Sequence, residues 1–338
     1  MSRQTRRTRR EAPPADARNL SAKDLWSQVL KRLSEHPNAT LQDPDYDPEP
    51  DRQKLRIAMR DAGWTDDQID SLLQAQEERI AAAPSTSPGV APHAEFIFGK
   101  LCDDVEAAMT RLGMDSHGRV ARGIEPRLGP WAAKTNVIMT DESIVTVGAQ
   151  LFRFCGVVAR AFTRTVMLDP TAWESANYRP EDGVRRIRSR PDLLKYWLQI
   201  YLSYAVTGMH VLVPFRPSSP FEAILFEQVA RAMELFATAH EFGHHHLDHG
   251  RAIDVTAARR EEYEADQFAL RICREIEKQP VLLENPYLSS GAGGLILLRA
   301  MRMLGRFEAK LDGVAERVTA HWETIDLGPT RGRSGPLA

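Results

Sequence analysis

Cysteine is scarce in this chain of 338 residues. Only Cys102, Cys155 and Cys273 occur, and they lie far apart with no paired spacing. This argues against a disulfide framework and against a cysteine-ligated metal site, and it suits a reducing compartment. We therefore expect a cytoplasmic protein in which none of the three thiols binds a metal.

The sequence also lacks a long, clean apolar run. Its most apolar stretch, residues 197–215, is interrupted by Gln199, Ser203, Thr207 and His210. A membrane-spanning helix needs roughly 20 predominantly apolar residues. We therefore expect a buried helix here and no membrane span.

An excess of charge of one sign is missing as well, because the formal net charge is −2. No global field therefore points to nucleic acid or to an anionic surface. The basic N-terminus is the one place where such a role is conceivable, and no apolar signal core follows it. Its arginines are Arg3, Arg6, Arg7, Arg9 and Arg10. We interpret this segment as a solvated tail and predict no nucleic-acid partner.

Composition and periodicity predict five regions along the chain. Residues 1–19 form a disordered basic tail, 20–83 a small helical accessory region, and 84–95 a linker rich in proline and small residues. Residues 96–327 form the main domain, and 328–338 a flexible tail. Helical periodicity dominates the main domain, so we predict a mainly helical α+β fold with a small β-sheet.

Two kinds of local signal support this fold. Ser21 and Thr65 are placed to cap short N-terminal helices, and residues 136–148 hold two β-rich runs around a polar turn, which predicts a hairpin. Further helices are expected over 96–112, 151–166, 192–204, 221–249, 257–275 and 295–311.

The strongest functional signal is His240-Glu241-Phe242-Gly243-His244, an H-E-x-x-H motif near the end of a predicted apolar helix. Residues four apart share a helix face, so His240 and His244 can hold one cation together. Two neutral imidazoles suit zinc, and Glu241 is placed to act on a metal-bound water.

A catalytic zinc site usually takes a third protein ligand. A histidine in the pattern H-E-x-x-H-x-x-G-x-x-H is excluded, because Leu247 and Gly250 occupy the required positions. A following helix supplies Glu262 and Asp266, which are four residues apart and share a face, whereas Glu264 points about 200° away from Glu262. Glu262 can therefore bind zinc while Asp266 holds a ligand imidazole.

These two motifs resemble those of the gluzincin metallopeptidases. Their residue patterns are similar to those of ImmA/IrrE-type, M48-type and phage-exclusion Lit-like peptidases. The resemblance implies a zincin-like domain, zinc bound by His240, His244 and Glu262, Glu241 as general base, and Asp266 as the outer partner. It also implies a hairpin ahead of the active-site helix whose edge aligns a peptide.

The predicted activity is zinc-dependent endopeptidase cleavage, in which Glu241 takes the proton of a zinc-bound water. The substrate is expected to be a protein or peptide of a regulatory or defence type. Three residues are candidates for stabilising the oxyanion, Tyr263, His210 and His321.

Two other functions fit the same motifs. One is a regulatory or sensor protein with a zincin-like domain and little or no proteolysis. The other is a structural zinc site, which normally closes with four protein ligands. The remaining histidines, His245, His246 and His249, lie on other faces of an ideal helix, so we interpret them as solvated or packing side chains.

Overall fold

The computed structural model describes the chain between residues 21 and 326, with gaps. The described ranges are 21–34, 49–61, 63–82, 92–114, 119–137, 140–166, 180–210, 220–250, 254–279 and 284–326. The predicted tails 1–19 and 328–338 lie outside these ranges. Residues 84–91 of the predicted linker also lie outside the described ranges. Helix α4 begins inside that linker, at Pro92.

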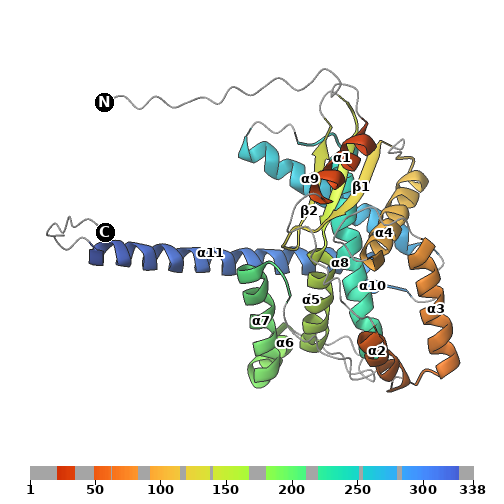
Figure 1. Cartoon of the computed structure of the whole chain (residues 1–338), viewed down its shortest axis with the longest axis horizontal. Helices are drawn as coiled ribbons and strands as arrows, with labels where there is room; N and C mark the ends of the chain where they lie inside the picture. The colour runs from red at the N-terminus through yellow and green to blue at the C-terminus, as the bar shows by residue number, and fades with distance from the viewer. Residues whose placement is uncertain are drawn as a thin grey trace, which may run out of the picture. The chain divides into compact units, whose positions relative to one another are not determined.

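The described residues form a mainly helical α+β structure with one small sheet (Figure 1). The helices are α1 (Ala22–Ser34), α2 (Glu49–Asp61), α3 (Asp66–Ala82), α4 (Pro92–Arg111), α5 (Gln150–Val166), α6 (Pro180–Ser189), α7 (Pro191–Thr207), α8 (Pro220–His246), α9 (Val255–Glu277), α10 (Pro286–Ser289) and α11 (Ala292–Asp326). The strands are β1 (Val120–Glu125), β2 (Ala132–Asn136) and β3 (Ser143–Gly148). None of the described helices is both long and apolar enough to cross a membrane.

The chain divides into two compact units. The first contains residues 1–127, 131–149 and 234–284, and the second contains 128–130, 150–233 and 285–338. Helix α8 contributes residues to both. The predicted main domain, 96–327, therefore supplies parts of both units, whereas every residue of the candidate zinc site falls in the first.

The sheet of the first unit has the strand order β1-β3-β2. Strand β3 pairs parallel with β1 and antiparallel with β2, with Asn136 opposite Ser143 and Ala132 opposite Val147. The predicted hairpin is thus present, although its first strand begins earlier than expected, at Ala132. Strand β1 was not predicted.

Helix α1 packs against this sheet through Trp26. The indole lies so close to Gly123 of β1 that a Cβ atom there would overlap the ring. Trp26 shares a buried cluster with Ala22, Ala121 and Ile144. A glycine in mid-strand normally weakens a sheet; here it makes room for the largest side chain of α1.

The two predicted helix caps are confirmed. The Asp24 amide donates to Ser21 Oγ (3.2 Å), and the Ser21 amide donates to the Asp24 carboxylate (3.1 Å). At the start of α3 the Gln68 amide donates to Thr65 Oγ1 (3.3 Å), and the Thr65 amide donates to Gln68 Oε1 (3.0 Å). Both are reciprocal capping boxes, which satisfy backbone donors left open at a helix start.

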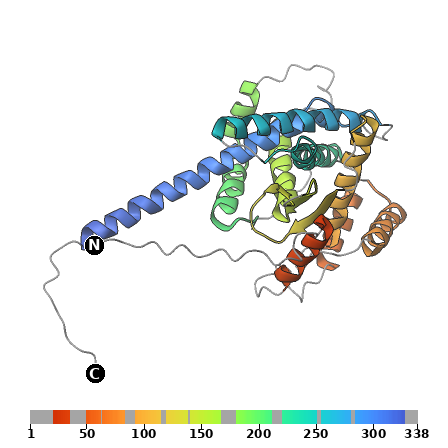
Figure 2. The same cartoon turned by 90° about the horizontal axis from the view of Figure 1, so that it is seen from above.

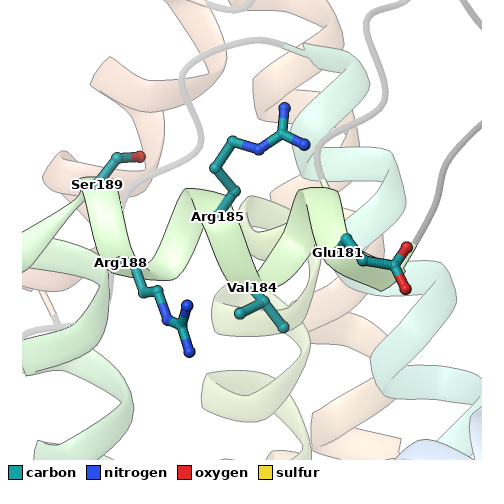
Figure 3. A pocket seen from close by; sticks show the side chains of 5 residues that line it. All are labelled: Glu181, Val184, Arg185, Arg188 and Ser189. Atoms are coloured by element: carbon teal, nitrogen blue, oxygen red, sulfur yellow. The ribbon is translucent and has the colours of Figure 1, made fainter.

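The second unit is helical in its described part. Helix α7 packs against α5 and α11, and Tyr204 meets Phe154 of α5 edge-on, with ring centroids 5.0 Å apart. A partly buried ion pair joins Arg164 Nε to Glu222 Oε1 at 2.7 Å. A surface hollow in this unit is lined, among the described residues, by α6 alone (Figure 3). Its lining residues are Glu181, Val184, Arg185, Arg188 and Ser189.

Candidate metal centre

The last turns of α8 carry the H-E-x-x-H motif. Buried apolar residues, among them Phe236, Ala239 and Phe242, anchor these turns, so the opposite face is held rigidly. Figure 2 views α8 close to end-on, with α9 running across it. Gly243 allows this close approach, because a Cβ atom there would lie 3.0 Å from Phe268 Cδ1 of α9. Ala265 of α9 is fully buried.

Three side chains from α8 and α9 converge at the crossing. The Nε2 atoms of His240 and His244 are 3.0 Å apart. The Glu262 carboxylate lies 3.3 Å from His240 Nε2 and 3.6 Å from His244 Nε2. One potential ligand atom from each residue lies within 4.8 Å of the other two. The structure thus brings together the three residues that the sequence analysis predicts as ligands.

The spacing of these donors fits a zinc ion. Zinc–nitrogen bonds of about 2.0–2.1 Å at tetrahedral angles place two ligand nitrogens about 3.3 Å apart. The observed 3.0 Å needs only a small rotation of the rings to reach that value. Among the residues that the structure describes, no fourth His, Cys, Asp or Glu joins the group. The Glu262 side chain is 64% exposed, which leaves the centre open to solvent on that side.

Asp266 lies where an outer partner is expected. Its Oδ1 is 3.0 Å from His240 Nδ1. A carboxylate at this nitrogen keeps a proton on Nδ1, so Nε2 is the atom that faces Glu262 and His244 and that would offer its lone pair to a bound ion. The aspartate therefore orients His240 and raises its basicity.

Glu241 is buried beside the centre, with 8% of its surface exposed. Burial raises the pKa of its carboxyl to about 7, and the Glu262 charge adds to this rise. His240 and a backbone hydrogen bond from Lys134 of β2 oppose it. A carboxyl group that exchanges its proton near neutral pH is suited to general acid–base catalysis.

The two motif histidines differ in proton affinity when no metal is bound. Burial lowers the pKa of His240, but hydrogen bonds to Asp266 and Glu262 outweigh it and raise that pKa to about 9. Burial and the charge on His240 lower the pKa of His244 to about 4. The hydrogen bond to His240 lowers the pKa of Glu262. In the metal-free protein one proton is therefore shared among His240, His244 and Glu262, the three side chains that would together hold a cation.

The interpretation of His245 and His246 as packing residues agrees with the structure. His245 is buried, and its Nδ1 lies 2.9 Å from Ser143 Oγ of β3. His246 is exposed and its ring lies 5.3 Å from that of Phe268.

His249 departs from the ideal-helix expectation. Helix α8 ends at His246, and the His249 amide donates to the carbonyl of His244 (2.9 Å) while the Asp248 amide donates to that of His245 (3.1 Å). These two bonds form a Schellman motif with Asp248 in the left-handed conformation (φ 55°). The turn folds His249 back, so that its Nδ1 lies 3.0 Å from His244 Nδ1.

The left-handed residue of this turn supports a stability prediction. Asp248→Gly should raise the free energy of unfolding by about 0.5 kcal/mol, and Asp248→Val should lower it by about 1–2 kcal/mol, because only glycine adopts this conformation without a Cβ clash. Urea unfolding followed by circular dichroism measures both, with Asp248→Asn as a near-neutral control. A glycine variant as unstable as the valine variant would contradict this explanation.

The structure describes the side chains of two of the three oxyanion candidates. Tyr263 lies next to Glu262 on α9 and is 63% exposed. His210 belongs to the second unit and is buried. The side chain of His321 lies outside the described residues.

His210 instead predicts a pH effect on stability. Burial, with the charges of Arg153 and Arg160, lowers its pKa to about 4, and its Nε2 has no hydrogen-bond partner in the described part of the chain. The unfolded chain then binds the proton more tightly, so stability present above pH 6.5 is lost as the pH falls towards 4. His210→Met should reduce this acid loss by about 2 kcal/mol in urea titrations at pH 7 and pH 4.5. An unchanged acid loss would show that His210 is not its source.

The comparisons with known proteins add no relative: no protein-family model, no curated protein and no solved structure matches the chain.

Proposed function

We propose that this protein is a zinc-dependent endopeptidase whose metal is held by His240, His244 and Glu262. The observation that carries the proposal is the convergence of the two Nε2 atoms and one carboxylate beside the buried Glu241. The proposal extends to a zincin-like fold of the gluzincin type, because the order of ligands along α8 and α9 is the one that the sequence resemblance implies. A structural site is disfavoured by the three-ligand group and its exposed side.

Each residue has a separate task in this mechanism. His240, His244 and Glu262 would hold the ion, which when bound would supply Lewis acidity that lowers the pKa of a water molecule and polarises a carbonyl. Glu241 accepts the proton of the attacking water and passes it to the leaving amine. Asp266 keeps the His240 lone pair directed at the ion.

Strand β2 is the candidate for aligning the peptide. It forms one edge of the sheet, and the backbone of its Lys134 hydrogen bonds to Glu241. A peptide that adds to this edge as a further strand would run close to the general base. Specificity would then come from side-chain contacts on alternating residues.

The proposal is tested by an unbiased cleavage assay. The zinc-loaded full chain is incubated with peptides from a proteome digest, and new termini are mapped by mass spectrometry. We expect new internal cleavages that 1,10-phenanthroline suppresses and added Zn²⁺ restores. Stoichiometric zinc without any zinc-dependent cleavage would favour the sensor function, and absence of zinc binding would reject the metal site itself.

A further inference from the structure

A chain of hydrogen bonds leads from the second motif histidine to a carboxylate of α9. His249 Nδ1 lies 3.0 Å from His244 Nδ1, and His249 Nε2 lies 3.1 Å from Glu264 Oε2. His249 is 5% exposed, whereas the Glu264 side chain is 46% exposed. The contact to His244 is therefore shielded from water, and the chain of hydrogen bonds ends at the surface, at Glu264.

When both imidazoles are neutral, the two contacts allow a single arrangement of protons along these hydrogen bonds. A carboxylate only accepts hydrogen bonds, so Glu264 requires the proton of His249 to be on Nε2. A neutral His249 then offers a lone pair at Nδ1, which requires a proton on His244 Nδ1. The lone pair of His244 is thus left on Nε2, the atom that faces His240 and Glu262.

The backbone holds His249 in this position from two sides. The Schellman turn ties its amide to His244, and its carbonyl oxygen accepts hydrogen bonds from Lys134 Nζ (2.8 Å) and Asn136 Nδ2 (3.1 Å) of β2. A side chain fixed in this way can orient its neighbour at little cost in side-chain entropy.

We propose that His249 and Glu264 are positioning residues of the metal centre, which fix the tautomer and ring orientation of His244 through the chain Glu264–His249–His244. The inference rests on the proposed metal site and extends it. It gives His244 the counterpart of what Asp266 gives His240, with one more imidazole interposed. Both ligand rings then have their Nδ1 atoms occupied and their Nε2 atoms directed at the ion.

The test measures metal affinity and histidine tautomers in the full chain. His249→Phe keeps a ring of similar size without nitrogens, and should weaken Zn²⁺ binding about 10–100-fold in chelator competition, the usual loss for an outer partner. Glu264→Gln should weaken it about tenfold, because an amide can also donate and no longer fixes the His249 proton. Glu261→Gln removes a charge from the same turn of α9, while its amide oxygen can still accept the hydrogen bond of the Gly250 amide (2.9 Å), and it should leave the affinity unchanged.

Two further measurements separate positioning from general damage. The double variant of His249→Phe and Glu264→Gln should bind Zn²⁺ as weakly as His249→Phe alone, because both act through one chain. Long-range ¹⁵N–¹H spectra of the metal-free protein should show His244 protonated at Nδ1, and a mixture of tautomers in His249→Phe. His249→Gln, whose amide oxygen can accept from Nδ1, should recover part of the affinity.

Unchanged Zn²⁺ affinity in folded His249→Phe, or full additivity in the double variant, would overturn the inference. Neither readout involves peptide cleavage. The expected losses of zinc affinity in a protein that cleaves no peptide would therefore contradict the peptidase proposal alone. If His240→Ala and His244→Ala also leave zinc binding intact, the metal site itself is wrong.

Discussion

Replacing Glu241 by glutamine is expected to abolish peptide cleavage while leaving stoichiometric zinc in place. Glutamine has the same shape and can keep its contact with the backbone of β2, but it cannot accept the proton of the attacking water. Positioned general bases contribute about 10²–10⁴-fold to rate, so kcat/KM should fall by at least that lower bound. The measurements are the rate of cleavage of a mapped peptide and the zinc content of the purified variant.

A control for this substitution lies on the same helix. Glu227 is an exposed carboxylate of α8 in the second unit, and Glu227→Gln should change neither zinc content nor rate. Wild-type cleavage by Glu241→Gln would remove the general-base assignment and leave the ligand set untouched. Loss of zinc in Glu241→Gln would mean that the carboxylate belongs to the metal site itself.

The sequence predicts the ligand constellation because helical periodicity determines it. His240 and His244 share a face of α8 by their spacing, and Glu262 and Asp266 share a face of α9 for the same reason. In the structure Glu264 is indeed absent from the ligand group. Geometry that follows from one regular helix can therefore be predicted from the spacing of residues in the sequence.

The direction of the His249 side chain could not be predicted from helical spacing. Its predicted direction assumed that α8 continues to residue 249, but the chain turns at Asp248 and reverses the direction of the side chain. The sequence signal for a helix end at Asp248 is weak. Aspartate tolerates the left-handed conformation less well than glycine, and Gly250 is the more evident helix stop. A non-local contact across this turn cannot be deduced from helical angles.

Strand β1 and helix α6 were missed for a related reason. In β1, Arg122 and Gly123 interrupt the alternation of apolar residues, yet Arg122 pairs with Asp103 of α4 and Gly123 accommodates Trp26. Tertiary partners thus explain residues that look unfavourable for a strand. Helix α6 is short, and its three arginines and two acidic residues leave few apolar residues to reveal a helical period.

Removing the Glu262 carboxylate is expected to have the largest effect on the metal. Glu262→Ala leaves two imidazoles, and we expect Zn²⁺ affinity to fall by more than about 100-fold, beyond the loss for an outer partner. Chelator competition on the full chain measures this, with Glu261→Gln as the neighbouring carboxylate control. Cleavage should disappear with the metal, unlike in Glu241→Gln, where the metal remains.

The exposure of Glu262 makes this a demanding test. Its side chain is 64% exposed and its carboxylate oxygens lie beside both histidines, so its loss leaves no buried cavity and should not unfold the chain. Any fall in zinc affinity can then be assigned to the lost ligand instead of to a damaged fold. Retained stoichiometric zinc in Glu262→Ala would require another donor to complete the site and would remove the gluzincin-type ligand set.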